Sequence, residues 1–230
     1  MASDDLDRFE AVAKRRRSVR AFRPEPVDRA LICRALDIAA TAPSNCNTQP
    51  WRVEIVSGAA LAALREALVA RFRGGEAPAH DVPPPFVYAG LHRERQIDAA
   101  VRLFAAQGVA RHDKEARRRS MQRNYQFFDA PHAAFLFLPD GAGAREAGDC
   151  GQFAQTFMLA LAAAGVGSCA QGSLSAYPEI VRDMLGLAGG GQLLMGISFG
   201  YADEDDPTSA VRPERCAIDD FTRFHDGSAR

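Results

Sequence analysis

The sequence lacks an excess of charge of either sign. Its 28 lysine and arginine residues nearly balance its 29 aspartate and glutamate residues, which leaves a formal net charge of -1. No global field therefore draws the chain toward nucleic acid or anionic lipid. A long apolar run is also missing, because the most apolar stretch, residues 157–166, is far too short to span a bilayer. We expect neither nucleic acid nor membrane as a partner.

Cysteine is scarce and scattered. The five cysteines are an odd number and form no C-x-x-C pair, which argues against a disulfide framework and against a zinc site. The N-terminal residues are acidic and lack the apolar core of a secretory signal, so we expect a cytoplasmic protein with reduced thiols. We interpret Cys150 as structural. The same holds for Cys46 and Cys169, although each lies in a polar segment that could border a ligand.

Familiar catalytic motifs are missing as well. The sequence contains no G-x-S-x-G, no H-E-x-x-H and no Walker motif. Its five histidines are dispersed, and none pairs with another at metal-ligand spacing. We therefore expect no metal site and no catalytic residue that acts without a cofactor.

A polar stretch, Thr41 to Trp51, separates an apolar helix-like run from an apolar strand-like run. It contains prolines, asparagines, a serine and a glutamine, and its side chains and free backbone N–H groups need polar partners. It is either an ordinary helix-to-strand connection or a loop that cradles a ligand. Trp51, the only tryptophan, would anchor its exit into the core.

A basic cluster, Arg16 to Arg20, follows the first expected helix and precedes a proline-containing turn. Composition alone favours a solvated run of charge, and the balanced net charge makes a nucleic-acid patch a weak alternative. Guanidinium groups beside a serine hydroxyl also match the oxygens of one phosphate, so a phosphate clamp is the third interpretation. Two polar loops and an arginine clamp, without an acid–base or metal set, indicate that a bound cofactor carries the reaction.

Hydrophobic periodicity predicts helices interleaved with strands in one α+β domain over residues 1–230. Helices are expected at 4–15, 28–40, 59–72, 93–110, 112–126, 144–164 and 177–185, and strands at 52–57, 135–138 and 193–201. An irregular loop or lid is expected at 74–91, a second small polar loop at 169–175, and a C-terminal arm, extended or partly a strand, at 203–230.

Five motifs occur in order along nearly the whole chain: R-R-S-V-R at 16–20, A-P-S-N-C-N-T-Q-P-W at 42–51, G-V-G at 165–167 followed by Q-G at 171–172, G-Y at 200–201 and R-P-E-R at 212–215. Together they resemble the FMN-dependent nitroreductase family, and the first two at this spacing are quite specific. The run N-Y-Q-F-F-D-A-P at 124–131 is similar to the branch that includes nitrobenzoate reductases.

The resemblance implies an α/β sandwich with a central, mostly antiparallel sheet flanked by helices, in an intertwined homodimer that binds FMN at the subunit interface. It implies that NAD(P)H delivers a hydride to the flavin and leaves, after which a nitroaromatic or quinone-like acceptor takes the electrons in a ping-pong cycle. Arg117, Arg118 and Arg119 could meet the 2′-phosphate of NADPH, but a solvated helix face is the favoured interpretation.

Four segments supply the cofactor residues that the resemblance implies. It implies that the ribityl phosphate is held by Arg16, Arg17, Ser18 and Arg20, and also by Arg212 and Arg215 of the C-terminal arm. The flavin ring would be lined by Pro43, Ser44, Asn45, Asn47 and Gln49, partly from the partner subunit. Gln171 and Gly172 would lie beside the redox-active edge of the ring. Many relatives carry a glutamate at the position of Gln171. Plain surface charge is the alternative for the two C-terminal arginines.

Tyr125 and Phe128 are assigned to the substrate pocket, with simple core packing as the alternative. Two other functions stay open. One is a flavoenzyme of the same fold that acts on an activated alkene or a halogenated aromatic, and the other is a non-catalytic protein that binds flavin or nucleic acid.

Overall fold

The structure is a computed structural model of the 230-residue chain, and it describes residues 2–82, 87–187 and 190–225. A four-stranded antiparallel sheet forms its middle layer, in the order β1-β2-β4-β3. The strands are β1 (Arg52–Ser57), β2 (His132–Leu138), β3 (Gly167–Gln171) and β4 (Gln192–Gly200). The predicted α+β architecture with an antiparallel sheet is confirmed.

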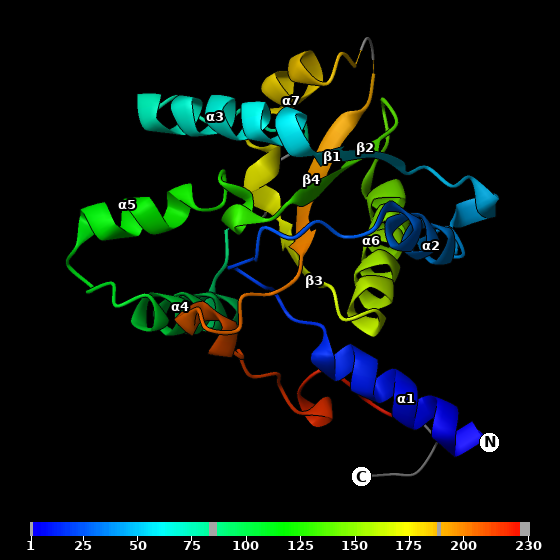
Figure 1. The fold of residues 1–230 in the computed structure, drawn as a ribbon. Helices are drawn as coiled ribbons and strands as arrows, with labels where there is room; N and C mark the ends of the chain where they lie inside the picture. Colours follow the sequence, from blue (N-terminus) through cyan, green and yellow to red (C-terminus); the bar gives the residue numbers. More distant parts are fainter. Residues whose placement is uncertain (1, 83–86, 188–189, 226–230) are drawn as a thin grey trace.

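Strand β2, one of the two inner strands, is apolar after His132 because both of its faces are covered. Its residues alternate between two hydrophobic cores: Ala133, Phe135 and Phe137 belong to one, and Ala134 and Leu136 belong to the other. Helices α3 (Gly58–Gly74) and α7 (Pro178–Met184) pack on the first face, whereas α2 (Arg29–Ala39) and α6 (Ala144–Ala163) pack on the second (Figure 1).

Three helices project from this sandwich: α1 (Ala2–Arg15), α4 (Gly90–Ala106) and α5 (Lys114–Gln122) (Figure 1). Each of them exposes apolar side chains, among them Phe9 on α1, Val101 on α4 and Met121 on α5. Short 3₁₀ helices complete the fold, namely η1 (Asn45–Asn47), η2 (Phe127–Asp129), η3 (Gly172–Ser175), η4 (Pro207–Ala210) and η5 (Ile218–Asp220). No helix in the described part of the chain is long and apolar enough to cross a membrane.

The second polar loop and the helix predicted at 112–126 differ from the structure, and β2 begins three residues earlier than predicted, at His132. The prediction of a second polar loop at 169–175 is wrong, because residues 167–171 form the edge strand β3 and residues 172–175 form η3. These small and polar residues have little strand propensity of their own, and they form a strand because they pair with β4. The helix predicted at 112–126 ends at Gln122. After it, Phe127, Phe128 and Asp129 adopt left-handed φ angles of 56°, 52° and 67° and turn the chain into β2.

The predicted lid at 74–91 is only partly irregular. Its beginning is held against the body, because Asp81 pairs with both terminal nitrogens of Arg182 and accepts a hydrogen bond from Leu193 N at 2.8 Å. Residues 83–86 lie outside the described residues, and α4 already begins at Gly90. The C-terminal arm, where described, contains η4 and η5 between irregular segments, and Glu214 in it pairs with Arg102 of α4 at 3.0 Å.

A buried histidine links the sheet to the segment before α2. Nε2 of His132 accepts a hydrogen bond from Val27 N at 2.8 Å, and the ring stacks on Phe199 with centroids 5.1 Å apart. Since Nε2 accepts, the neutral ring carries its proton on Nδ1 and donates it to Ser57 Oγ at 2.5 Å. Burial lowers the pKa of His132.

Protonation of His132 should therefore make folding pH-dependent. The unfolded chain takes up this proton near pH 6.5, whereas the folded ring resists it, so the stability is fully present above about pH 6.5 and is lost as the pH falls toward the lower folded pKa. The slope is at most about 1.4 kcal/mol per pH unit. Urea denaturation of wild type and His132→Gln between about pH 7.5 and 5.5 measures it. Equal slopes in the two proteins would contradict the prediction.

Candidate active site

The basic cluster lies along the outer edge of β3. Val19 N donates to Ser168 O at 3.0 Å, and Ser18 and Ser168 form a parallel bridge. Gly167 makes this approach possible, because a Cβ at that position would lie 2.8 Å from Cγ2 of Val19. With Val19 buried against the strand, its neighbours Ser18 and Arg20 stay half-buried.

The cluster meets the C-terminal arm in a cavity of about 410 Å³, here called the basic pocket. Its polar and charged lining residues are Glu10, Lys14, Arg16, Arg17, Ser18, Arg20, Arg212 and Arg215. The only carboxylate among them, that of Glu10, pairs with Lys14 at 2.5 Å. The pocket therefore concentrates arginine charge from two segments far apart in sequence, which a plain solvated run of charge would not do.

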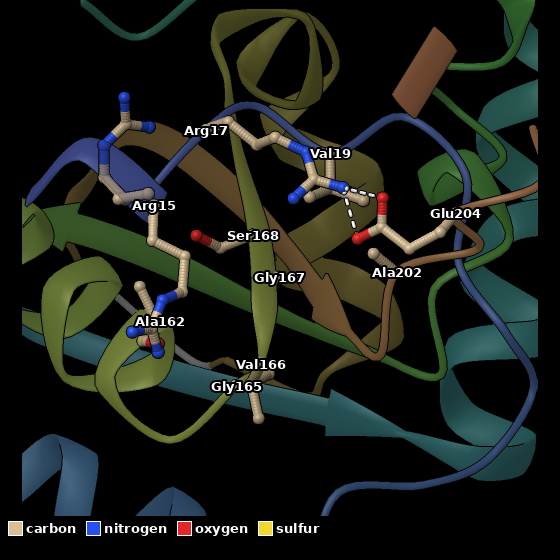
Figure 2. Close-up of a pocket in the computed structure, with 11 residues that line it drawn as sticks. Arg15, Arg17, Val19, Ala162, Gly165, Val166, Gly167, Ser168, Ala202 and Glu204 are labelled. Atoms are coloured by element: carbon tan, nitrogen blue, oxygen red, sulfur yellow. Dashed lines mark hydrogen bonds and ion pairs between the residues drawn. The ribbon is translucent and has the colours of Figure 1, made fainter. Parts of the chain in front are cut away.

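Arg17 is fixed in place before any ligand arrives. Its Nη2 lies 2.6 Å from both carboxylate oxygens of Glu204 (Figure 2). Its Nε is buried and has no hydrogen-bond partner among the described residues. Burial, and then the positive charge of Arg17, lower the pKa of Arg212. Like charges are thus held close together, and an anion in the pocket would relieve their repulsion.

A smaller cavity of about 150 Å³ adjoins the basic pocket, and Arg16 and Arg17 line both (Figure 2). Arg15 borders it and donates to the carbonyl oxygen of Ala162, near the end of α6, at 3.4 Å. The backbone of residues 165–168 forms another side. This cavity shows how the end of α6 and the start of β3 support the arginine segment.

The loop from Thr41 to Trp51 is rigidly held but presents its tip to the outside. Ser44 Oγ accepts from Gln49 N at 3.0 Å, and the buried carboxylate of Asp149 on α6 accepts from Asn45 N at 3.0 Å. Trp51 stacks on Phe153 with centroids 5.1 Å apart and anchors the exit, as predicted. Left-handed φ angles of 50°, 57° and 48° at residues 46, 47 and 49 turn the exposed polar side chains outward.

The corner between β3 and η3 forms a third part of the candidate site. Gln171 is buried, whereas Gly172 is exposed, and a Cβ on Gly172 would meet no atom within 4 Å. The backbone of this corner therefore faces open space, while the side chain of Gln171 points inward.

Comparison with known proteins identifies the fold. The sequence model of the Nitroreductase family matches residues 13–201. The chain belongs to the nitroreductase family. Nitroreductase NfnB of Mycolicibacterium smegmatis is 44% identical over 216 residues, which are 94% of this chain and 92% of that protein. A 4-nitrobenzoate reductase of Pseudomonas putida is 33% identical over 95% of this chain and 96% of its own length.

Solved structures agree. The crystal structure of the FMN-dependent nitroreductase NfnB from Mycobacterium smegmatis in complex with NADPH has a TM-score of 0.92 and 43% identity. The matched region spans 96% of this chain and 99% of the chain in that crystal structure. The resemblance stated from the motifs is confirmed.

The predicted nitroreductase site residues fall in separate places within one chain. The six assigned to the phosphate meet in the basic pocket, whereas the five of the flavin-ring loop, Pro43, Ser44, Asn45, Asn47 and Gln49, are not among its lining residues. Gln171 and Gly172 lie at the corner of β3 and η3. Assignment of all three groups to one cofactor stays a prediction.

The two residues assigned to substrate lie in the hydrophobic core. Tyr125 packs against Phe72 and Tyr177 with ring centroids 4.9 and 5.6 Å away, and Phe128 is 3% exposed. Core packing, the alternative interpretation, is therefore what these side chains do in the single chain, and contact with a substrate stays a prediction.

The three arginines of α5 are also engaged. The Arg117 guanidinium lies 5.1 Å from the ring centroid of Phe104, Arg118 donates to the carbonyl of Arg73, and Arg119 pairs with Glu115 at 3.0 Å. These contacts stabilise the helix against its surroundings. A role for them in binding the 2′-phosphate of NADPH stays untested.

The buried cysteines are structural. Burial raises the pKa of the Cys150 thiol to about 11, and burial raises that of Cys169 although Arg20 and Arg16 lie near it. Neither supplies a thiolate near neutral pH. Cys46 is exposed in the polar loop.

Sequence reasoning missed the acidic residues that organise the site. Asp149 is not among the candidates named from the sequence, although a carboxylate in an apolar helix signals a buried partner. Glu204 lies in the acidic run 203–206 and is not among those candidates either, yet it orients Arg17. Each contact joins residues more than 100 positions apart, so no local pattern predicts it.

Replacing Gly167 by alanine should disturb the arginine segment. The new Cβ would lie 2.8 Å from Val19 Cγ2 and 3.3 Å from its Cβ, and overpacking of this kind costs about 1–3 kcal/mol. Urea denaturation should show that loss. Gly148→Ala on α6, where a Cβ meets nothing within 4 Å, is the matched control and should gain up to about 1 kcal/mol. Equal stability of the two variants would contradict the proposed close contact.

Proposed function

We propose that the chain is an FMN-dependent oxidoreductase that uses NAD(P)H to reduce nitroaromatic or quinone-like acceptors. The observation that carries the proposal is the basic pocket, where Arg16, Arg17, Arg20, Arg212 and Arg215 surround one cavity. The donor set fits a phosphate monoester, because guanidinium groups and the Ser18 hydroxyl match its oxygens in charge and geometry. The buried Nε of Arg17, which lacks a partner, is consistent with such an anion.

The chain would bind and orient, and the cofactor would supply the redox chemistry. When bound, FMN would supply the redox chemistry between the nicotinamide donor and the acceptor. The basic pocket would hold the phosphate, and the exposed loop Pro43 to Gln49 would offer side chains and backbone groups to the ring. Backbone N–H groups at Gln171 and Gly172 would stabilise negative charge at the redox-active edge, as oxyanion-type donors do.

The relatives support the donor and acceptor classes. The structure of the Mycobacterium smegmatis protein is described as an FMN-dependent nitroreductase in complex with NADPH. The Pseudomonas putida relative is named a 4-nitrobenzoate reductase. From these similarities we infer a nicotinamide donor and an electron-poor aromatic acceptor for this chain.

A cytoplasmic homodimer is part of the proposal. Exposed apolar side chains on α1, α4 and the C-terminal arm, such as Phe9, Val101 and Phe221, are the kind of surface that a second copy buries. Unpaired cysteines suit a reducing compartment. A dimer would let the loop of one subunit meet the basic pocket of the other, and gel filtration with light scattering tests its existence.

Anaerobic reduction tests the proposed function most directly. The purified protein should be yellow, and NADH or NADPH should bleach the flavin without oxygen. Subsequent addition of 4-nitrobenzoate or a quinone should restore the colour. A protein that is colourless and takes up no FMN would refute the enzyme. Flavin that neither nicotinamide reduces would instead indicate a non-catalytic flavin-binding protein, and recovery only with an activated alkene or a halogenated aromatic would change the acceptor class.

Removing two arginines from the basic pocket should release FMN. Each charged hydrogen bond contributes about 1.5–3 kcal/mol, so Arg16→Ala combined with Arg20→Ala should raise the Kd for FMN by at least about 100-fold without unfolding the chain. Fluorescence titration of the apoprotein measures the Kd, and circular dichroism reports folding. The control is Arg29→Ala with Arg145→Ala, which removes equal charge from exposed helix positions outside the pocket. Equal FMN affinity in both double variants would refute the clamp.

A further inference from the structure

The side-chain amide of Gln171 is fully engaged inside the protein. Its Nε2 donates to the backbone oxygen of Asn124 at 3.0 Å and to Asn124 Oδ1 at 3.3 Å. Its Oε1 accepts from Ser198 Oγ at 2.5 Å, and the residue is 4% exposed. Both N–H donors and the oxygen are thus in use, so the amide has no donor left for a ligand.

The surroundings of this amide present acceptors where it donates. Asn124 Nδ2 donates to the carbonyl of Met121 at 3.1 Å, which turns Asn124 Oδ1 toward Gln171. The backbone oxygen of Asn124 cannot change role. An amide satisfies both acceptors, whereas a carboxylate would face two oxygens without a proton to offer.

The amide joins three segments of the fold. It fixes the end of β3 to Ser198 on β4 and to the turn that follows α5, where residues 127–129 are left-handed. Such residues cost about 1–3 kcal/mol each and persist only where the surroundings hold them. On the other side of the corner, Gly196 pairs with Gln171 and lets Leu174 of η3 approach, since a Cβ there would lie 2.5 Å from Leu174 Cδ1. The place of Gly172 between these contacts is therefore determined.

We propose that Gln171 is a positioning residue: its amide, held between Asn124 and Ser198, fixes the β3–η3 corner whose backbone meets the flavin ring. This inference rests on the proposed function, and it assigns the side chain a role through the backbone of Gln171 and Gly172. The amide sets the distance and direction of the N–H groups at the redox-active edge. The reduction potential of the flavin then depends on a side chain that does not touch it.

Gln171→Glu tests the proposal, because it keeps the shape and changes only the donor. The protonated acid still offers one O–H to Asn124, whereas the ionised form offers none and repels two oxygens. The Kd for FMN of this variant should therefore rise as the pH is raised from about 5.5 to 8.5, by at least about 10-fold relative to wild type, a factor that corresponds to about 1.4 kcal/mol. The midpoint potential of the bound flavin, measured by dye equilibration, should shift over the same interval.

Other titratable or charged groups beside the network are Cys169, Arg123 and Tyr125. Burial raises the pKa of the Cys169 thiol, and burial, followed by Tyr177, raises that of Tyr125 to about 12. Arginine stays protonated throughout. A pH dependence that appears only in the glutamate variant thus belongs to the introduced carboxyl group.

Gln171→Met is the second variant, since it keeps the length and removes all three hydrogen bonds. This variant should shift the midpoint potential of the bound flavin at every pH without adding a pH dependence. If the glutamate variant fails to fold, the methionine variant still tests the positioning role. Wild-type affinity and potential in the variants would overturn the positioning role while leaving the proposed function intact. A wild-type protein that binds no FMN would overturn both.

Discussion

Close approach at three glycines of the β3–β4 ladder is the constraint on which the candidate site depends. A Cβ at Gly167 would collide with Val19, one at Gly196 with Leu174, and one at Gly200 with Cδ of Pro131, each at 2.8 Å or less. These neighbours belong to the arginine segment, to η3 and to the turn that enters β2. Because these three residues of β3 and β4 lack side chains, the three neighbouring segments can pack directly against the sheet.

Partners within the chain hold three arginines of the basic pocket in place. Glu204 holds Arg17, the carbonyl of Ser209 accepts from Arg212 at 2.6 Å, and the carbonyl of Pro213 accepts from Arg215 at 2.9 Å. These contacts fix the arginines without neutralising them, apart from Arg17. Preorganised donors of this kind would lose little entropy on binding an anion, which supports the proposed phosphate site.

Local patterns in the sequence predicted what depends on neighbours in the chain. Strand β1 was predicted to the residue, and the apolar stripe of α6 placed that helix within one residue of its observed end. The two arginine-containing segments, 16–20 and 212–215, are far apart in the sequence and come together only in the folded chain. Only the family resemblance could therefore predict them as one site. Strand β3 could not be predicted, since its small polar residues gain strand structure by pairing with β4 and by admitting Val19. The roles of Asp149 and Glu204 could not be predicted for the same reason, because their hydrogen-bond partners lie far away in the sequence.

Helix α6 contacts both the polar loop and the residue that precedes the arginine segment. Asp149 near its beginning holds the loop at Asn45, and Ala162 near its end receives Arg15, next to the arginine segment. At about 1.5 Å per residue, these two points on the helix lie roughly 20 Å apart. The loop of the same subunit is not among the residues that line the basic pocket, so in the proposed site a second copy would supply the loop beside a bound ring. The loop is nevertheless rigid, polar and exposed, which suits the surface of a site completed by a second copy. The length of this helix therefore supports the proposed dimer, as do the exposed apolar side chains of α1 and α4.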